Sequence, residues 1–162
     1  MATSNGSELV VSVPQGGQVI KTFNLTPNLP VGGKISDWLW ADVSAPTAQV
    51  AAVRVKFNIN SSAMEQDFER AILVINLQQN SNSNGYWRFA LNGVAINPEY
   101  KDVYHNVDFE VVDDETLIAH IQVIGDTLET IKFSFVASFT DAASGVVTTY
   151  ESQDPDIIPG RP

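Results

Sequence analysis

Cysteine is absent from this 162-residue chain. The absence excludes a disulfide framework, a thiolate metal site and a cysteine nucleophile. Basic residues are also scarce, since 9 Lys and Arg stand against 19 Asp and Glu, which gives a formal net charge of −10. A negative field of this size repels phosphate groups, so we expect neither nucleic acid nor an anionic membrane surface as a partner.

Long hydrophobic runs are missing too. No stretch of about 18 apolar residues is present, so a membrane-spanning helix is not expected. Residues 1–7 are small and polar, and no charged start is followed by an apolar block, so no secretory signal peptide is visible. These features favour a soluble cytoplasmic protein, with export by a non-classical route left open. The 44% hydrophobic content suits one folded domain of this length.

What the chain does contain is alternation of apolar and polar residues. The clearest alternation runs from Val107 to Phe139, with a break at Gly125-Asp126. Period-two patterning is typical of strands that bury one face. Shorter runs of the same kind predict further strands over residues 9–13, 19–25, 51–59, 72–77, 86–91 and 146–150, and residues 35–43 predict a short strand or a wide turn.

Local signals place the turns between these strands. Asn92-Gly93 predicts a type I′ hairpin turn, because both residues tolerate positive φ. Residues 113–115 read as the tip of a second hairpin. Residues 62–65 form a Ser-x-x-Glu capping box, which predicts a helical turn extending to Arg70. A full helix over residues 63–79 is the competing interpretation.

Together these elements predict an all-β fold of about eight or nine strands with at most one short helical turn. No helix-length crossovers alternate with the strands, so an immunoglobulin-like antiparallel β-sandwich is favoured over a parallel α/β sheet. A closed barrel or a jelly roll is the second choice. We expect a flexible tail over residues 1–7, one sandwich domain over 8–151, and an extended segment without regular structure over 152–162.

The residues that usually carry catalysis form no recognisable set. His105 lies in a predicted loop and His120 in a strand, neither within a metal-ligand spacing, and no Gly-x-Ser-x-Gly elbow is present. Glu151, Asp154 and Asp156 form an acidic cluster without an EF-hand pattern. We therefore expect no enzyme, no cofactor and no metal site, although calcium binding by the acidic clusters stays open.

Aromatic residues are the candidates for ligand binding. Trp38 and Trp40 stand two apart, and Tyr86 and Trp87 follow an Asn/Ser-rich loop. Exposed aromatic rings can stack on sugars, whereas buried ones are common in sandwich cores, and packing is the favoured interpretation of both pairs. Trp38 is expected to be the more exposed of its pair, because it follows a Gly/Pro loop and Asp37.

The end of the chain carries the one pattern that points to a family. Residues 150–159 read Tyr-Glu-Ser-Gln-Asp-Pro-Asp-Ile-Ile-Pro and follow a predicted strand. This ending resembles that of the small bacterial DP-EP family, which is named for a C-terminal Asp-Pro…Glu-Pro-type motif. Asp154-Pro155 matches the first element, while Ile158-Pro159 stands where the second would read Glu-Pro. The resemblance implies a bacterial sandwich protein of unknown function, similar to inclusion-body proteins of the PixA/AidA kind, and carries over no catalytic residue.

Asp154-Pro155 also has a physical interpretation of its own. A residue before proline favours extended geometry, and its carboxylate can cap nearby backbone amides. We expect the segment to have a structural use, closing an open edge or end of the sandwich.

These features favour a non-enzymatic protein with a binding or self-assembly role. A carbohydrate-binding module using exposed aromatics is the alternative, and a hydrolase with an acidic pair ranks last. A homo-oligomer, a glycan or a protein partner all stay open. Edge-strand pairing would be discouraged where Arg54 and Lys56 lie on one strand. Any site is expected near Trp38, residues 80–87, residues 100–105 or Asp154-Pro155.

Overall fold

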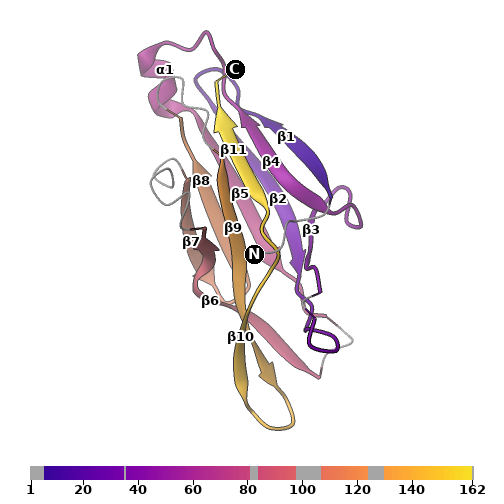
Figure 1. Ribbon diagram of the computed structural model, residues 1–162. Coiled ribbons are helices and arrows are strands. Elements are labelled where there is room, and N and C mark those ends of the chain that lie inside the picture. Colours follow the sequence, from indigo (N-terminus) through magenta and orange to yellow (C-terminus); the bar gives the residue numbers. More distant parts are fainter. Residues whose placement is uncertain (1–5, 35, 81–83, 98–106, 124–129, 162) are drawn as a thin grey trace.

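The computed structural model describes residues 6–34, 36–80, 84–97, 107–123 and 130–161 (Figure 1). The predicted all-β fold is confirmed, and these residues form eleven strands and one short helix. The elements are β1 (Ser7–Ser12), β2 (Gln18–Thr26), β3 (Leu39–Asp42), β4 (Val50–Lys56), α1 (Ala63–Phe68), β5 (Arg70–Leu77), β6 (Gly85–Ile96), β7 (Val107–Asp113), β8 (Thr116–Ile121), β9 (Ile131–Asp141), β10 (Val147–Glu151) and β11 (Asp156–Gly160).

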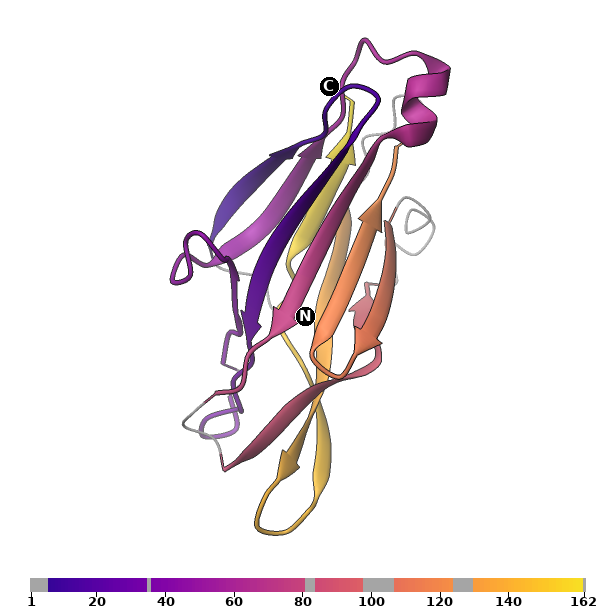
Figure 2. The same cartoon turned by 180° about the vertical axis from the view of Figure 1, so that it is seen from behind.

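The strands form two packed sheets that run along the length of the molecule (Figures 1 and 2). One sheet has the order β1-β4-β11-β9-β10, with β6 also paired to β9, and the other has the order β3-β2-β5-β8-β7. Three pairings are parallel, namely β1 with β4, β4 with β11 and β2 with β5. The sheets are therefore mixed, not antiparallel as predicted. The alternation of residues marks which face is buried, but it does not encode the direction of the neighbouring strand.

The capping box of α1 is confirmed. The Ser62 hydroxyl oxygen accepts a hydrogen bond from the Glu65 N–H at 3.2 Å, and the Ser62 N–H donates to the Glu65 carboxylate at 2.9 Å. The helix ends at Phe68, and β5 begins at Arg70. The competing long helix is wrong, because the β-branched run that follows Arg70 pairs along β2 and β8.

The predicted turn at Asn92-Gly93 is also wrong. Phe89 pairs with Ala137 and Val94 with Phe135, so β6 continues along β9 and the residues between form a bulge. Gly93 has a φ of 78°, and Leu91 has a φ of 55°. The positive φ that favours glycine is therefore used to widen one strand, not to reverse the chain.

The C-terminal segment differs from its prediction as well. Residues 156–160 form β11, which lies between β4 and β9, so the segment is an interior strand, not an irregular cover for an edge. Its pairing with β9 extends only over Asp156 and Ile157, so Pro159 lies beyond that ladder. Proline is tolerated there because its missing N–H removes no bond to β9.

The core lies between the two sheets. Trp40 packs against Phe23, Phe133 and Phe135, with ring centroids 5.0, 6.1 and 5.2 Å away. Inward-facing side chains of β2, β5, β8 and β9 complete this core. None of the described helical segments is long and apolar enough to span a membrane.

Candidate functional site

Several regions that the sequence singled out meet at one end of the sandwich. Trp38 comes just before β3, Trp87 lies near the start of β6, and Tyr150 lies near the end of β10. The Trp38 and Trp87 rings meet edge to face at 5.4 Å, and Tyr150 packs on Trp87 at 5.7 Å. We call this group, together with Gln79 and Gln153, the aromatic–amide cluster.

Two glutamines hold the backbone of the two tryptophans in the same way. The Trp38 N–H donates to Gln153 Oε1 at 2.8 Å, and Gln153 Nε2 donates to the Trp38 carbonyl at 2.7 Å. The Trp87 N–H donates to Gln79 Oε1 at 2.7 Å, and Gln79 Nε2 donates to the Trp87 carbonyl at 2.8 Å. Each side-chain amide thus replaces a neighbouring strand, which satisfies backbone groups where the sheet pairing stops.

Residues 152–155 connect β10 to β11 along one side of β9. The Ser152 N–H donates to the Phe135 carbonyl at 2.9 Å, and the Phe135 N–H donates to the Ser152 hydroxyl at 2.8 Å. The Phe133 N–H donates to the Pro155 carbonyl at 3.1 Å. The Asp-Pro segment is therefore an irregular link within one sheet, and it positions Gln153 within hydrogen-bond distance of the Trp38 backbone.

Asp154 is buried in this link, with 3% of its surface exposed. Burial raises the pKa of its carboxyl, the nearby Glu151 and Asp156 raise it further, and Lys132 opposes them. Lys132 itself is paired with Asp156 at 2.7 Å. Among the described residues no backbone amide donates to Asp154, so the expectation that this carboxylate caps backbone amides is wrong. The hydroxyl of the neighbouring Ser152 accepts a backbone N–H instead.

A groove of about 220 Å³ opens beside the cluster. One of its walls is strand β10, and the opposite wall is formed by residues that follow β2 and by Trp38. Its lining residues are Asn28, Pro30, Trp38, Thr149, Tyr150 and Glu151. Asn28 is fixed from both sides, because its amide donates to the Asp37 carbonyl at 2.6 Å and its Oδ1 accepts from Asn80 at 3.0 Å.

The β10 wall of the groove is an open strand edge. Within the described part of the chain, β10 pairs only with β9. The bonds between Asp141 and Val146 and between Ser152 and Phe135 fix which residues face β9. Because bonded and unbonded positions alternate in an antiparallel pair, Val147, Thr149 and Glu151 direct their backbone N–H and C=O groups away from β9. These groups are available to an added strand.

The four aromatic candidates separate into two kinds. Trp38, Trp40 and Trp87 are each 1% exposed, whereas Tyr86 is 51% exposed on the other face of β6. The favoured interpretation, packing, holds for the three tryptophans. The expectation that Trp38 is the more exposed of its pair is wrong, because its indole N–H is bonded to the Asn28 carbonyl at 3.1 Å and its ring packs on Trp87. Of the four, only Tyr86 offers an open ring face, and Trp40 lies apart in the core.

Gln79, Gln153 and Asn28 were not singled out by the sequence. Each occupies a polar loop or link, where amide side chains are ordinary, and the bonds of Gln153 join residues 115 positions apart. Neither residue spacing nor apolar–polar alternation indicates that a glutamine will bond a tryptophan so far away in the chain. The only sequence feature that pointed to Gln153 is its position next to the Asp-Pro motif.

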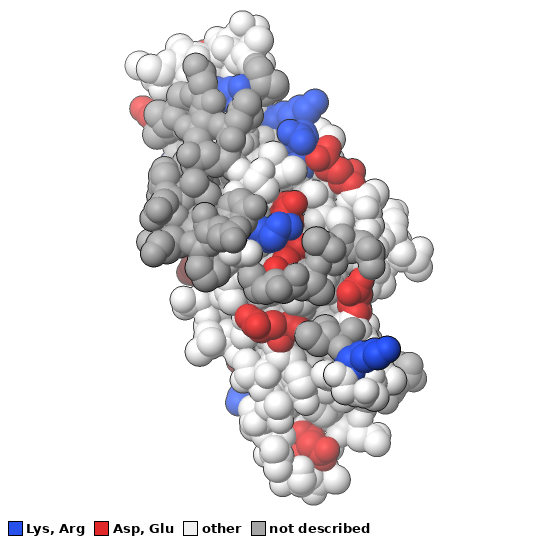
Figure 3. Space-filling model, viewed as in Figure 1, with Lys and Arg blue, Asp and Glu red and all other residues white. Residues whose placement is uncertain are grey.

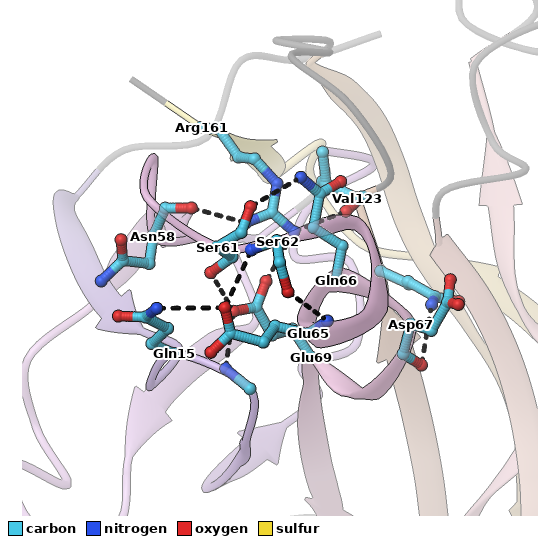
Figure 4. Close-up of polar contacts among 12 residues, drawn as sticks. Gln15, Asn58, Ser61, Ser62, Glu65, Gln66, Asp67, Glu69, Val123 and Arg161 are labelled. Atoms are coloured by element: carbon cyan, nitrogen blue, oxygen red, sulfur yellow. Dashed lines mark hydrogen bonds and ion pairs between the residues drawn. The ribbon is translucent and has the colours of Figure 1, made fainter.

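A second polar cluster occupies the opposite end of the molecule, where Figure 1 shows α1 and the end of β11, and its contacts are drawn in Figure 4. Arg161 and Glu69 form a buried ion pair at 2.6 Å, with 2% and 0% of their side chains exposed. Glu69 also accepts hydrogen bonds from the Ser61 hydroxyl and from the Gly16 N–H, the latter at 2.8 Å. Arg161 donates to the carbonyls of Asn58 at 2.6 Å and Val123 at 2.8 Å.

This cluster suits a structural role. Burial alone would raise the pKa of Glu69, but the bonds from Ser61, Gly16 and Arg161 outweigh it and hold the pKa below its ordinary value. The carboxylate thus stays ionised at neutral pH and is a poor proton donor. Through Arg161 the cluster ties the end of β11 to the region of α1.

The two histidines and the acidic residues were the candidates for catalysis and metal binding. His120 is 38% exposed on the outer face of its sheet, 3.9 Å from Glu110. His105 and residues 100–105 lie outside the described residues. Among the residues that the structure describes, no three His, Asp or Glu side chains converge in a way that could hold a metal ion.

Comparison with known proteins extends the C-terminal resemblance to most of the chain. The DP-EP family matches over residues 6–161, far beyond the Asp154-Pro155 motif that first indicated it. No curated protein matches the chain. The similarity to proteins of the PixA/AidA kind stays a prediction. With a family match that spans both sheets and ends at the buried Arg161, the chain belongs to the DP-EP family.

Proposed function

We propose that this protein is a non-enzymatic binding module, and that its binding site is the groove beside β10. The observation that carries the proposal is the open edge of β10, which forms one wall of that groove. An extended peptide segment entering the groove would add a strand to β10 and pair with Val147, Thr149 and Glu151. Strand addition of this kind draws its affinity from backbone hydrogen bonds and its selectivity from side-chain contacts.

The groove chemistry supports a peptide partner. Pro30 and the edge of Trp38 provide apolar contact, while the Asn28 amide and the Glu151 carboxylate provide polar contact. The site is also firmly held, because Gln153 and Asn28 fix Trp38 from two directions. A preformed site loses little conformational entropy on binding.

The state of the buried carboxylates supports a non-catalytic role. Asp42 is paired with Lys21 at 2.6 Å and Glu69 with Arg161 at 2.6 Å. Burial works against ionisation of Asp42, but its bonds from Lys21 and Ser44 lower its pKa overall. Neither carboxylate has the raised pKa of a general acid, and Asp154, which does, is buried away from the groove lining.

Carbohydrate recognition is the second candidate, and the exposed ring of Tyr86 is the observation that favours it. A glycan that stacks on Tyr86 would bind on the outer face of β6, whereas a peptide would bind at β10. The two candidates therefore use different residues.

The test uses two probes, a library of random linear peptides displayed on phage and a glycan array. Each is screened with the wild-type protein, with Thr149→Pro and with Tyr86→Ala. Proline at 149 removes a backbone donor that faces away from β9, so the β9 ladder stays intact. We expect peptides that bind the wild type and Tyr86→Ala but not Thr149→Pro. Glycans lost only with Tyr86→Ala would support the second candidate. If no peptide or glycan depends on either residue and the chain does not bind itself, the proposal is wrong.

A further inference from the structure

We infer that the partner at the β10 edge is a second copy of this chain, paired antiparallel through β10 about a two-fold axis. The inference rests on the proposed function, because it assigns an occupant to the same edge. The two copies would join their sheets into one continuous sheet across the interface.

The other edges of the two sheets are protected against pairing. Strand β3 has only four residues. Strand β7 carries Asp108, Glu110 and Asp113. Strand β1 carries Glu8, which is ion-paired with Arg54, and β6 carries Arg88 and a bulge. Short length, charge and bulges are the usual devices that prevent edge-to-edge association.

Strand β10 has none of these devices along most of its length. It reads Val-Thr-Thr-Tyr-Glu, with no proline, no basic residue and one acid at its end. Thr148 and Thr149 are exposed, as are Val146 and Val147 at 59% and 49%. β-Branched residues of this kind favour strand pairing.

The distribution of charge meets the requirement that a second copy sets. The chain has a net charge of −10, which opposes self-association, so two copies can meet only through a surface that is itself uncharged. Residues 142–150 contain no charged side chain. The lower end of the face in Figure 3, where Figure 1 shows the β9–β10 hairpin, is correspondingly mostly uncharged.

The two-fold geometry also separates the one acid of the strand from its copy. Two residues that face each other in an antiparallel pair direct their backbone groups either both toward or both away from the other strand, so the two-fold axis passes through a residue position. With the axis at Thr148, the outward-facing Val147 of each copy pairs with Thr149 of the other, and the two Glu151 side chains lie about six residues apart along the ribbon. At about 3.4 Å per residue this is roughly 20 Å, beyond the Debye length of about 8 Å at physiological ionic strength. The axis position also leaves room for the partner, because the hairpin extends past the body of the sandwich in both views (Figures 1 and 2).

The first experiment measures solution mass by size-exclusion chromatography with light scattering over a range of protein concentrations. A single-strand interface is small, so we expect a concentration-dependent shift from 17.6 kDa toward twice that mass. Val147→Lys places two like charges near each other across the axis and is expected to abolish the shift. Val112→Lys is the matched control, since Val112 is a valine of similar exposure (53%) on the β7 edge, and it should leave the shift unchanged.

The second experiment uses the absence of native cysteine. Thr148→Cys places a thiol on the proposed axis, opposite the same residue of the second copy, where facing residues of an antiparallel pair are within disulfide reach. Mild oxidation should yield covalent dimers of Thr148→Cys and not of Val112→Cys. Equal cross-linking at both positions would mean random collision and would overturn the inference.

The outcomes separate this inference from the proposed function. A wild-type protein that stays monomeric at every concentration overturns self-pairing. If that monomer still binds peptides in a Thr149-dependent way, the groove binds another protein and the proposed function stands. A dimer that Val112→Lys disrupts and Val147→Lys does not would assign the interface to β7, again against the inference.

Discussion

The side-chain amide of Gln153 makes both backbone hydrogen bonds of Trp38, at 2.8 Å to its N–H and 2.7 Å to its carbonyl. Both residues are buried, so water does not reach these groups readily when the amide is removed. The Asp-Pro link of the family motif is thereby coupled to Trp38, which forms part of one wall of the groove.

Gln153→Ala should therefore destabilise the protein substantially. Each buried backbone group left unpaired costs about 1–3 kcal/mol, so we expect a loss of roughly 2–6 kcal/mol in the free energy of unfolding. Urea unfolding followed by tryptophan fluorescence measures this loss.

Gln79→Ala is the matched control for Gln153→Ala. Gln79 makes the same two contacts to Trp87, but its side chain is exposed, so water can replace it. We expect a cost of about 1 kcal/mol or less for this variant. Equal losses for the two variants would mean that burial does not set the value of these bonds.

The ion pair of Glu69 and Arg161 gives a second prediction. Arg161→Met removes the cation and leaves Glu69 buried without its partner, so we expect a loss of about 3–5 kcal/mol in unfolding free energy. The double variant Glu69→Leu/Arg161→Met leaves no unpaired charge and should recover part of that loss. Chemical denaturation of the three proteins measures both effects.

Arg54→Met tests whether any broken ion pair has the same effect. The Glu8–Arg54 pair is solvent-exposed, with side chains 41% and 39% exposed, and exposed pairs contribute about 0–1 kcal/mol. A loss as large as that of Arg161→Met would contradict the assigned role of burial.

The fold could be predicted from the sequence as far as local patterning reaches. Alternation located most strands, and Ser62 with Glu65 located the helix start, because each signal depends on neighbours in the chain. The parallel pairing of β2 with β5 and the interior position of β11 depend on distant segments, which no local pattern records. Trp38 is a particular example, because its loop setting favoured greater exposure than Trp40. Both tryptophans are 1% exposed, and the backbone of Trp38 is bonded to Gln153, 115 residues away.

Asp154 gives a prediction about pH. Its pKa is raised in the folded state, so the folded protein holds that proton more tightly than the unfolded chain does. Its contribution to stability is complete below the ordinary Asp pKa of about 3.9 and is lost as the pH rises through the raised value. Asp154→Asn removes the ionisation, so this variant should be more stable than the wild type at pH 7 and should lose that advantage in acid.

Urea unfolding at a series of pH values measures the difference. Asp156→Asn is the control, because Asp156 is paired with Lys132 and its neutralisation should give no gain at pH 7. A loss of stability for Asp154→Asn at pH 7 would show that the ionised carboxylate is stabilising, against the sign expected here.

Gly93 in the β6 bulge gives the last prediction, and Gly33 supplies its control. Both residues have a φ of 78°, so alanine at either position meets the same backbone strain, about 1–2 kcal/mol. At Gly33 an added Cβ meets nothing within 4 Å, whereas at Gly93 it would lie 2.8 Å from Leu117 Cδ1 and 3.1 Å from Val111 Cγ2. Overpacking of this kind typically costs a further 1–3 kcal/mol or so. Gly93→Ala should thus lose more stability in urea unfolding than Gly33→Ala, and equal losses would mean that Leu117 and Val111 yield without cost and that backbone conformation alone requires glycine in the bulge.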